Sequence, residues 1–296
     1  MFLLLVIPMV LLLTLESLLW KRNRRAPMVS LLGTTVWSLV FVAIAFFATL
    51  PFEDTPFQNY SWEIIGFTVL QVTFIICNIL LWVKIMRKVP LSVAEPIALF
   101  RIILLTVFAW IIFGGALTTV QIILGSVIFL SCMALGYIQG KNKAHLTTDR
   151  DMGGGMFLLF LWVLTSVGIN LVTQQIMRSG VRPITHATIQ NIFILVVVIV
   201  MFLIRQPREL GHAFKTILRD RNHIGIGFGG AVGRICFSFA LSIFSVNVGL
   251  LTAVQVATVA LVVALSAVIY KEKVRWYAYP LIIAIIVSAT VISLGI

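Results

Sequence analysis

The sequence predicts an all-α polytopic membrane protein with ten transmembrane helices. Of its 296 residues, 60% are hydrophobic and only 11% are charged, whereas soluble domains carry about 45–50% apolar and about 25% charged residues. The apolar residues also form unbroken runs of about 20, the length that a helix needs to cross a bilayer. A transmembrane β-barrel would instead alternate apolar and polar residues.

The apolar runs define the expected helices. They cover residues 2–20, 28–50, 62–83, 91–113, 118–138, 155–177, 184–204, 224–246, 249–270 and 277–296. The first run lacks a basic n-region and a small-residue cleavage site, so we expect a spanning helix rather than a removed signal peptide. Cys77, Cys132 and Cys236 lie inside apolar runs without metal or redox spacing, and are expected to be small core residues.

The net charge of +12 reflects membrane topology and does not indicate a nucleic-acid partner. Loops after the odd-numbered helices hold 18 of the 22 Lys and Arg residues, beginning with "KRNRR" at 21–25. The positive-inside rule therefore predicts these loops in the cytoplasm and both termini outside, in a multi-pass protein of the plasma or inner membrane. Residues 205–223 are expected to form a short basic amphipathic helix that meets anionic lipid headgroups.

Two halves of similar spacing suggest an internal repeat. The polar segment 139–154 separates residues 1–138 from residues 155–296, and each half holds five predicted helices. Pro27 and Pro183 each open the second helix of a half. Because five is odd, the second copy enters the membrane from the opposite side. Such inverted repeats are typical of secondary transporters, whose substrate site lies at the repeat interface near mid-membrane.

The last two helices of each half carry a more specific pattern. In residues 250–295 a small-residue-rich helix leads through the turn Tyr270-Lys271-Glu272-Lys273-Val274 to a final helix. This segment resembles the end of an EamA-type repeat of the drug/metabolite transporter superfamily, where the turn reads aromatic or Gly, x, Glu, Lys/Arg, Leu/Val. Residues 91–135 match it in length.

The first copy shares further family features and departs from others. It has the helix-four proline, Pro96, and the fifth-helix residues Gln121 and Gly125. It shows Gly114-Gly115 where the family usually has Glu, and the second copy has Val254-Gln255 in place of the proline. The layout resemblance covers the whole chain, and the motif resemblance about 45 residues per half.

The resemblance implies a secondary transporter that moves a small metabolite or amphipathic molecule by alternating access. Helices three, four, eight and nine, with one and six, would line the path, and the termini would be cytoplasmic, opposite to the charge rule. A lipid or lipid-phosphate flippase, an intramembrane enzyme and a non-transporting scaffold are the alternatives. We predict no catalytic residues, cofactor or metal, because no paired-His spacing, G-x-S-x-G or Asp-rich motif is present.

Four charged residues fall within predicted helices, where charge is costly and usually functional. Arg101 and Arg234 lie about ten residues into their helices and are expected to hold an anionic group of the substrate, such as a carboxylate or phosphate. Glu16 and Glu95 are the proton-coupling candidates. Glu16 could instead pair with the "KRNRR" run, and Glu95 could stabilise a helix N-terminus. On one helix Glu95 and Arg101 would project about 120° apart, so each arginine needs a partner from elsewhere.

Uncharged polar residues accompany these charges. They are Gln71 and Asn78, Asn170 and Gln174, His186, Gln190 and Asn191, and Gln255. Such residues often join helices by hydrogen bonds. As a set they could instead ring a polar cavity, with Gln71, Asn78, Asn170, Gln174 and Gln255 contacting substrate. Both interpretations are open at the level of sequence.

The glycine-rich stretch "HIGIGFGGAVGR" at 223–234 fits G-x-G-x-x-G. A dinucleotide turn needs a preceding strand in a soluble βαβ unit, whereas here a basic loop precedes and an apolar run follows. Gly225, Gly229 and Gly233 are also spaced four apart. That spacing predicts a smooth stripe on one helix for close contact with another.

Overall fold

The structure is a computed structural model that describes residues 2–23, 25–52, 59–113, 118–143, 150–243, 248–270 and 276–294. Throughout these residues the regular structure is helical, and none of them lies in a strand. The predicted all-α class is confirmed.

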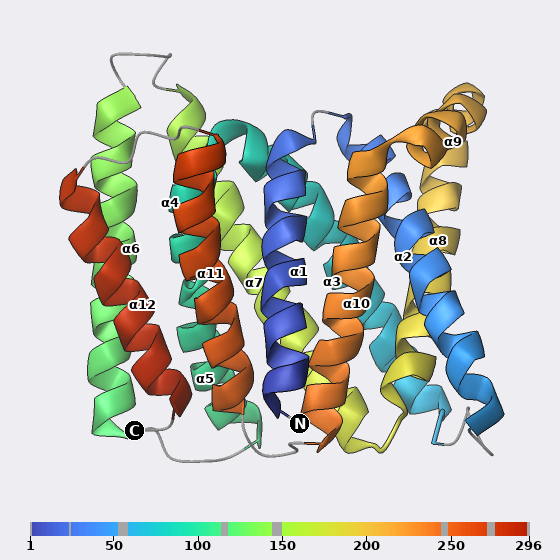
Figure 1. Cartoon of the computed structure of the whole chain (residues 1–296), viewed down its shortest axis with the longest axis horizontal. Helices are drawn as coiled ribbons and strands as arrows, with labels where there is room; N and C mark the ends of the chain where they lie inside the picture. The colour runs from blue at the N-terminus through green and yellow to red at the C-terminus, as the bar shows by residue number, and fades with distance from the viewer. Residues whose placement is uncertain are drawn as a thin grey trace. The chain divides into compact units, whose positions relative to one another are not determined.

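The helices carry the labels of Figure 1. They are α1 (Phe2–Arg22), α2 (Pro27–Thr49), α3 (Trp62–Lys88), α4 (Leu91–Ala98), α5 (Phe100–Phe113), α6 (Thr119–Lys143), α7 (Arg150–Arg178), α8 (Pro183–Arg205), α9 (Leu210–Arg219), α10 (Arg221–Ile243), α11 (Val248–Ile269) and α12 (Tyr279–Leu294). Short 3₁₀ turns cover Leu50–Phe52, Pro207–Glu209 and Trp276–Ala278.

Four described helical segments are long and apolar enough to cross a membrane. They are Pro27–Thr49, Trp62–Lys88, Gly154–Arg178 and Pro183–Arg205. Large apolar side chains on them point outward, such as Ile204, which is 76% exposed. Contiguous outward apolar surface is expected where lipid replaces water. These helices indicate a helical membrane protein, as the composition predicts.

The continuous helix predicted over residues 91–113 is wrong, because the structure divides it into α4 and α5. Pro96 has no N–H and its ring crowds the carbonyl of Ser92 four residues earlier, which disrupts a helix. Leu99 forms a turn instead, and its N–H donates to the Pro96 carbonyl at 3.1 Å. The next helix therefore starts afresh at Phe100.

The short helix predicted within 205–223 is present as α9. Its inner face buries Ala213 and Ile217, while Lys215 and Arg219 are exposed. The apolar and basic faces are those expected of an amphipathic helix. Its contact with anionic headgroups stays a prediction.

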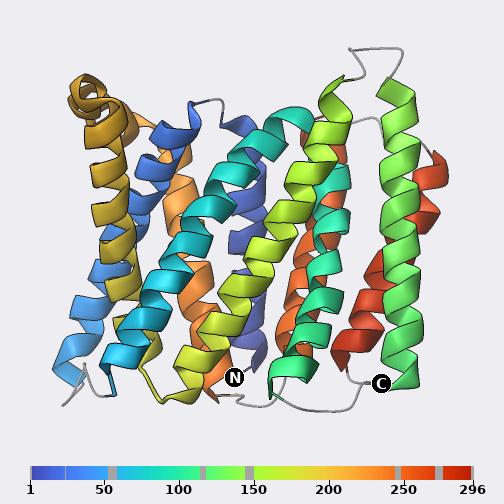
Figure 2. The ribbon, with the colours of Figure 1, turned by 180° about the vertical axis from the view of Figure 1, so that it is seen from behind.

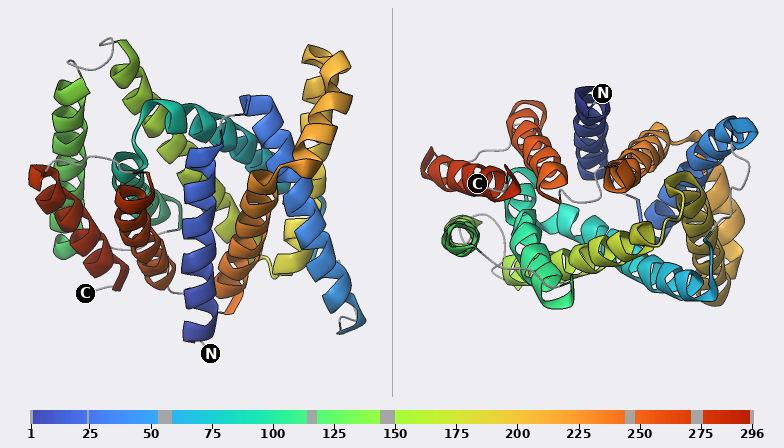
Figure 3. Two further views of the ribbon diagram at one scale, coloured as in Figure 1. Left: turned by 45° about the horizontal axis from the view of Figure 1, so that its top comes forward. Right: turned by 90° about the horizontal axis from the view of Figure 1, so that it is seen from below.

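The chain packs as two compact units. Unit 1 comprises Met1–Val83 and Val172–Val246, and unit 2 comprises Lys84–Leu171 and Asn247–Ile296. Within unit 1, α10 packs against α1 and α2, and α2 against α8 (Figures 1 and 2). Within unit 2, α12 packs against α6 and α11; Figure 3 shows α12 beside α6 in both views.

These units describe packing, whereas the predicted division at 139–154 describes a sequence repeat. The repeat boundaries therefore stay a prediction.

The glycine stripe of α10 contacts α1, which confirms the packing predicted for Gly225, Gly229 and Gly233. A Cβ added at Gly229 would lie 2.9 Å from the Leu12 carbonyl oxygen, and one at Gly233 would lie 2.8 Å from the Leu13 side chain. Glycine lets two helix backbones approach this closely, and close packing is what holds helices together in lipid.

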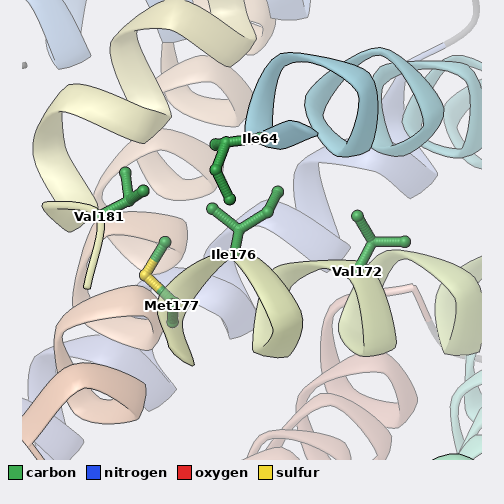
Figure 4. Packing of buried hydrophobic residues seen from close by; sticks show 5 residues of the cluster. All are labelled: Ile64, Val172, Ile176, Met177 and Val181. Carbon is green, nitrogen blue, oxygen red and sulfur yellow. The ribbon is translucent and has the colours of Figure 1, made fainter. Parts of the chain in front are cut away.

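An apolar cluster in unit 1 joins the start of α3, the end of α7 and the turn before α8. Its buried members are Ile64, Val172, Ile176, Met177 and Val181, and Figure 4 shows Ile64 pointing toward Ile176. Tyr60, just before α3, packs against the same cluster.

The turn between α7 and α8 is held by a glycine conformation and by a hydrogen bond from the segment before α3. Gly180 has φ +74°, a left-handed conformation that favours glycine after a helix. The Asn59 side chain donates a hydrogen bond from Nδ2 to the Gly180 carbonyl at 3.2 Å. This bond and the apolar cluster together hold Tyr60 over the first turn of α8.

Candidate functional site

Arg101 is the charged residue whose surroundings in unit 2 point most directly to a ligand. It is the second residue of α5, directly after the break at Leu99. Its guanidinium carbon lies 5.6 Å from the centroid of the Trp162 ring on α7, and Trp162 is only 7% exposed. A cation over a desolvated indole face gains about 2 kcal/mol.

The hydrogen-bonding capacity of Arg101 is not fully used. Its Nε atom is buried and has no hydrogen-bond partner among the described residues. A buried donor without an acceptor costs about 1–3 kcal/mol, and more when it is charged. The indole supports the face of the guanidinium and accepts none of its in-plane N–H bonds. An incoming anion would therefore supply the acceptor that this donor lacks.

Glu95 lies on the other side of the helix break. It is buried on α4 and acts electrostatically on Arg101. The predicted angle of about 120° between the Glu95 and Arg101 side chains assumed one continuous helix. Because the helix is broken at Leu99, that angle does not apply. The expected partner from another helix is present as Trp162.

The second predicted arginine and one predicted amide cannot be placed in the same way. Arg234 lies in α10 and Gln255 in α11, but both side chains fall outside the described residues. Gly114 and Gly115, in the family motif, also lie outside them. The proposed roles of Arg234 and Gln255 stay predictions.

The other predicted amides differ in burial. Gln71 is buried on α3, whereas Asn78 on the same helix is half-buried, as are Asn170 and Gln174 on α7. Asn170 belongs to unit 2 and the other three to unit 1. Whether one cavity collects them stays a prediction.

Glu16 is half-buried on α1, within unit 1. Its carboxylate accepts a hydrogen bond from Trp20 Nε1 at 3.3 Å. Its Cβ is also 3.2 Å from where a Cβ on Gly229 would lie, so Glu16 is on the face of α1 that meets the glycine stripe. A proton-coupling role for Glu16 stays a prediction.

A buried polar network in unit 1 links α3, α7 and α8. His186 Nε2 lies 2.8 Å from Oε1 of Gln71, and Gln71 Nε2 donates to Thr173 Oγ1 at 2.5 Å. Tyr60 OH lies 3.4 Å from His186 Nδ1 and 3.1 Å from Thr68 Oγ1. Gln71 and His186 are each 2% exposed. Sequence reasoning named these two and missed the other three.

The neighbouring amides of α8 have a structural environment. Gln190 and Asn191 are both buried. Asn191 Nδ2 donates to the Ala187 carbonyl at 2.7 Å, an interaction within the helix. Its Oδ1 has no hydrogen-bond partner among the described residues.

A second polar cluster joins the α1–α2 turn to the α9–α10 turn, also in unit 1. Asn23 Nδ2 donates to Ser30 Oγ at 3.1 Å and lies 3.4 Å from Nε2 of the fully buried His223. His223 Nδ1 is 3.2 Å from Asp220 Oδ2, to which Arg25 Nε donates at 3.4 Å.

The protonation of this cluster follows from its contacts. The Asn23 carbonyl oxygen accepts from the Arg25 N–H, so its NH₂ faces His223 and Nε2 must accept. Burial lowers the pKa of His223, which the Asp220 carboxylate only partly opposes. Burial raises the pKa of Asp220, but the Asn222 N–H, His223 and Arg25 outweigh it and leave that pKa lowered. The cluster therefore holds neutral histidine beside ionised aspartate.

Among the described residues, no three His, Cys, Asp or Glu side chains gather as they would to hold a metal ion. The expectation of a site without metal or cofactor stays a prediction.

Comparison with known proteins shows the fold. No family model matches the chain. No curated protein matches its sequence either. Twenty chains of solved structures are similar to it. One of them, described only as "Crystal structure of protein", has a TM-score of 0.64 and 12% identity, over 98% of this chain and 94% of that chain. The arrangement of helices thus occurs in a solved protein along almost the whole chain.

Proposed function

We propose that this chain is a secondary transporter of ten membrane-spanning helices that moves a small anionic metabolite or amphipathic molecule by alternating access. Arg101 would hold the anionic group. One observation carries this proposal: a guanidinium that rests on an indole face and whose buried Nε donor has no acceptor among the described residues. The EamA-like motifs of the sequence point to the same class of protein.

The broken fourth helix supports a binding site at this place. Transporters commonly bind substrate where a membrane helix is interrupted, because unwound backbone and helix ends present polar groups there. Irregular backbone at membrane depth is tolerated only where it is buried in protein or lines a cavity. The break at Leu99 lies two residues before Arg101 and is fully buried.

The packing of the units supports an inverted repeat. Counting α4 and α5 as one crossing, unit 1 contains the second and third helices of each proposed half, namely α2, α3, α8 and α10. Unit 2 contains the fourth and fifth of each, namely α4–α5, α6, α11 and α12. The first helices of the two halves do not follow this division, because α1 lies in unit 1 and residues 150–171 of α7 lie in unit 2. The other four helices of each half are grouped with their proposed equivalents, as expected of a repeat.

Contacts between loops support the proposed number of crossings. Asn59, before α3, bonds to Gly180, after α7, and Arg25, before α2, pairs with Asp220, before α10. Each pair of loops must share one side of the membrane. In the proposed topology four and six crossings separate the loops of each pair, and both numbers are even.

The chemistry of Arg101 favours a carboxylate or phosphate. The guanidinium stays protonated at any relevant pH and donates in a planar fork that matches two oxygens of such groups. Glu95 offsets its charge when no anion is bound, which keeps the empty site from being too costly. The Glu95 carboxylate would compete with the substrate anion for the Arg101 charge. Protonation of Glu95 would remove this competition, and this is how its predicted proton coupling would act.

The proposal is tested by binding and transport in purified protein. Detergent-solubilised protein is screened by thermal shift with mono- and dicarboxylates, organophosphates and phosphatidic acid, and each anion that stabilises it is assayed in proteoliposomes. We expect Arg101→Ala to weaken anion binding about 10- to 100-fold, which corresponds to the free energy of a charge-assisted hydrogen bond. Arg205→Ala, at an exposed arginine that ends α8, is the matched control.

Three outcomes separate the alternatives. Unchanged anion binding and uptake in a folded Arg101→Ala variant would refute the proposal. Stabilisation by phosphatidic acid and not by soluble organophosphates would favour the lipid-phosphate carrier. Chemical conversion of a bound anion without any gradient would favour an enzyme.

A further inference from the structure

The polar network around His186 has a second possible arrangement of its hydrogens. Thr68 donates its hydroxyl proton to the Ile64 carbonyl at 2.7 Å, so towards Tyr60 it can only accept. Gln71 donates its NH₂ to Thr173, so its carbonyl oxygen accepts from His186 Nε2–H. These two bonds fix the outer ends of the network. Only the Tyr60 hydroxyl proton and His186 Nδ1 between them are free to change.

With neutral His186, Nδ1 carries a lone pair and the Tyr60 O–H donates to it across 3.4 Å. When hydronium gives a proton to Nδ1, the new N–H donates to the Tyr60 oxygen. The Tyr60 hydroxyl then turns and donates to Thr68 Oγ1, 3.1 Å away. In both forms every one of these donors meets an acceptor, and a single hydroxyl rotation separates them. Without such an arrangement, the second ring proton of a buried histidine would meet a donor or an apolar wall and stay unsatisfied.

We propose that His186, with Tyr60 and Gln71, forms a proton-binding site that couples proton uptake to the packing of α3, α7 and α8. This assignment rests on the proposed transport function and adds a site to the sequence-based candidates Glu16 and Glu95. The site takes up one proton from water, and no other reactant is needed.

The arrangement in the structure is the neutral form. Of the described residues, the titratable group in contact with His186 is Tyr60, whose pKa is raised by burial, so that it stays a phenol. Glu63 on α3 and Arg178 on α7 are exposed, and Arg182 directly precedes α8. The α2 sequence has no titratable side chain. On α10 His223 belongs to the other cluster, and the further charged or titratable residues of that helix are Arg221, Arg234 and Cys236.

No described carboxylate contacts the protonated imidazole. Its charge is therefore better solvated in an arrangement where the network opens to water. By linkage, proton binding shifts the protein toward that arrangement, and the arrangement in turn binds protons more tightly. Tyr60 is half-buried just before the start of α3, and offers the entry point for the proton.

The test measures charge movement in proteoliposomes on a solid-supported membrane, with no substrate present. A jump from about pH 8 to about pH 4 should displace charge in the wild-type protein as protons enter the buried site. We expect His186→Gln to remove the component of this charge movement that belongs to the buried histidine. His212→Gln, at an exposed histidine of α9, should keep it.

A second variant decides the matter if His186→Gln does not fold. Tyr60→Phe keeps the ring that packs against the apolar cluster but removes the acceptor for Nδ1–H. Its half-saturating proton concentration should rise about tenfold, as expected for the loss of one hydrogen bond to a charged group. An unchanged titration in either folded variant, or no charge movement in the wild type, would overturn the proposal.

The same measurement separates this inference from the transport proposal. Arg101→Ala should keep the substrate-free charge movement while it loses anion binding. Charge movement that depends on His186, in a protein that neither binds nor moves any anion, would leave the proton site standing without the proposed transport function.

Discussion

Replacement of Gly229 by alanine provides the most direct test of the helix packing. A Cβ at this position would lie 2.9 Å from the Leu12 carbonyl oxygen of α1. This atom belongs to a helix backbone, so it can move only if α1 and α10 separate. Overpacking of this kind costs about 1–3 kcal/mol. At Gly233 the nearest atom, at 2.8 Å, is in the flexible Leu13 side chain, so Gly233→Ala should cost less.

Gly66→Ala is the matched control. Gly66 lies within the spanning helix α3, and an added Cβ there meets nothing within 4 Å. Both substitutions gain the same helix propensity, about 1 kcal/mol, so it cancels when the two variants are compared. The free energy of unfolding of Gly229→Ala should therefore lie about 1–3 kcal/mol below that of Gly66→Ala.

Reversible unfolding in mixed detergent and SDS micelles, followed by tryptophan fluorescence, gives the two free energies. Equal stability of Gly229→Ala and Gly66→Ala would refute the reasoning. That result would mean that the stripe does not bring α1 and α10 into backbone contact, and that the glycines have some other role.

Two further predictions concern the polar clusters. A double-mutant cycle compares Trp162→Leu in the wild type with Trp162→Leu in the Arg101→Met variant. The free energies of unfolding should reveal a coupling of about 0.5–2 kcal/mol between the two side chains. Zero coupling would contradict the cation–π contact. Because the pKa of His223 is lowered in the folded protein, its contribution to stability is present above about pH 6.5 and is lost as the pH falls toward the folded pKa. His223→Gln should flatten the fall in unfolding free energy below about pH 6.5. A slope equal to that of the wild type would show that the titration of His223 does not contribute to stability.

Patterns within single helices could be predicted, because they depend on local periodicity. The stripe of Gly225, Gly229 and Gly233 repeats every four residues, and its contact with another helix is confirmed. The amphipathic α9 follows in the same way, because its buried residues Ala213 and Ile217 and its exposed residues Lys215 and Arg219 are each four positions apart. The break at Leu99 was missed, although Pro96 was noted, because membrane helices often continue through proline when neighbours satisfy the freed carbonyl.

The polar network was only partly predictable for a different reason. Gln71 and His186 are 115 positions apart, and no local signal shows that they meet. Thr68 and Thr173 are ordinary residues of membrane helices and gave no reason to be singled out. One signal was available: Thr68 and Gln71 are three residues apart on the face of α3 that also carries Ile64, and polar residues on such a buried face need a partner.

The polar groups of this protein differ in how their contacts constrain their protons. In the Asp220–His223 cluster the contacts favour one protonation state, so the cluster is suited to holding two turns together. Arg101 has a buried donor that remains unfilled, which suits an anion from outside. His186 has its bonds filled in two ways that differ by one proton. An anion site and a proton site are the two requirements of a proton-coupled anion transporter, and the two proposed sites rest on independent contacts in separate units.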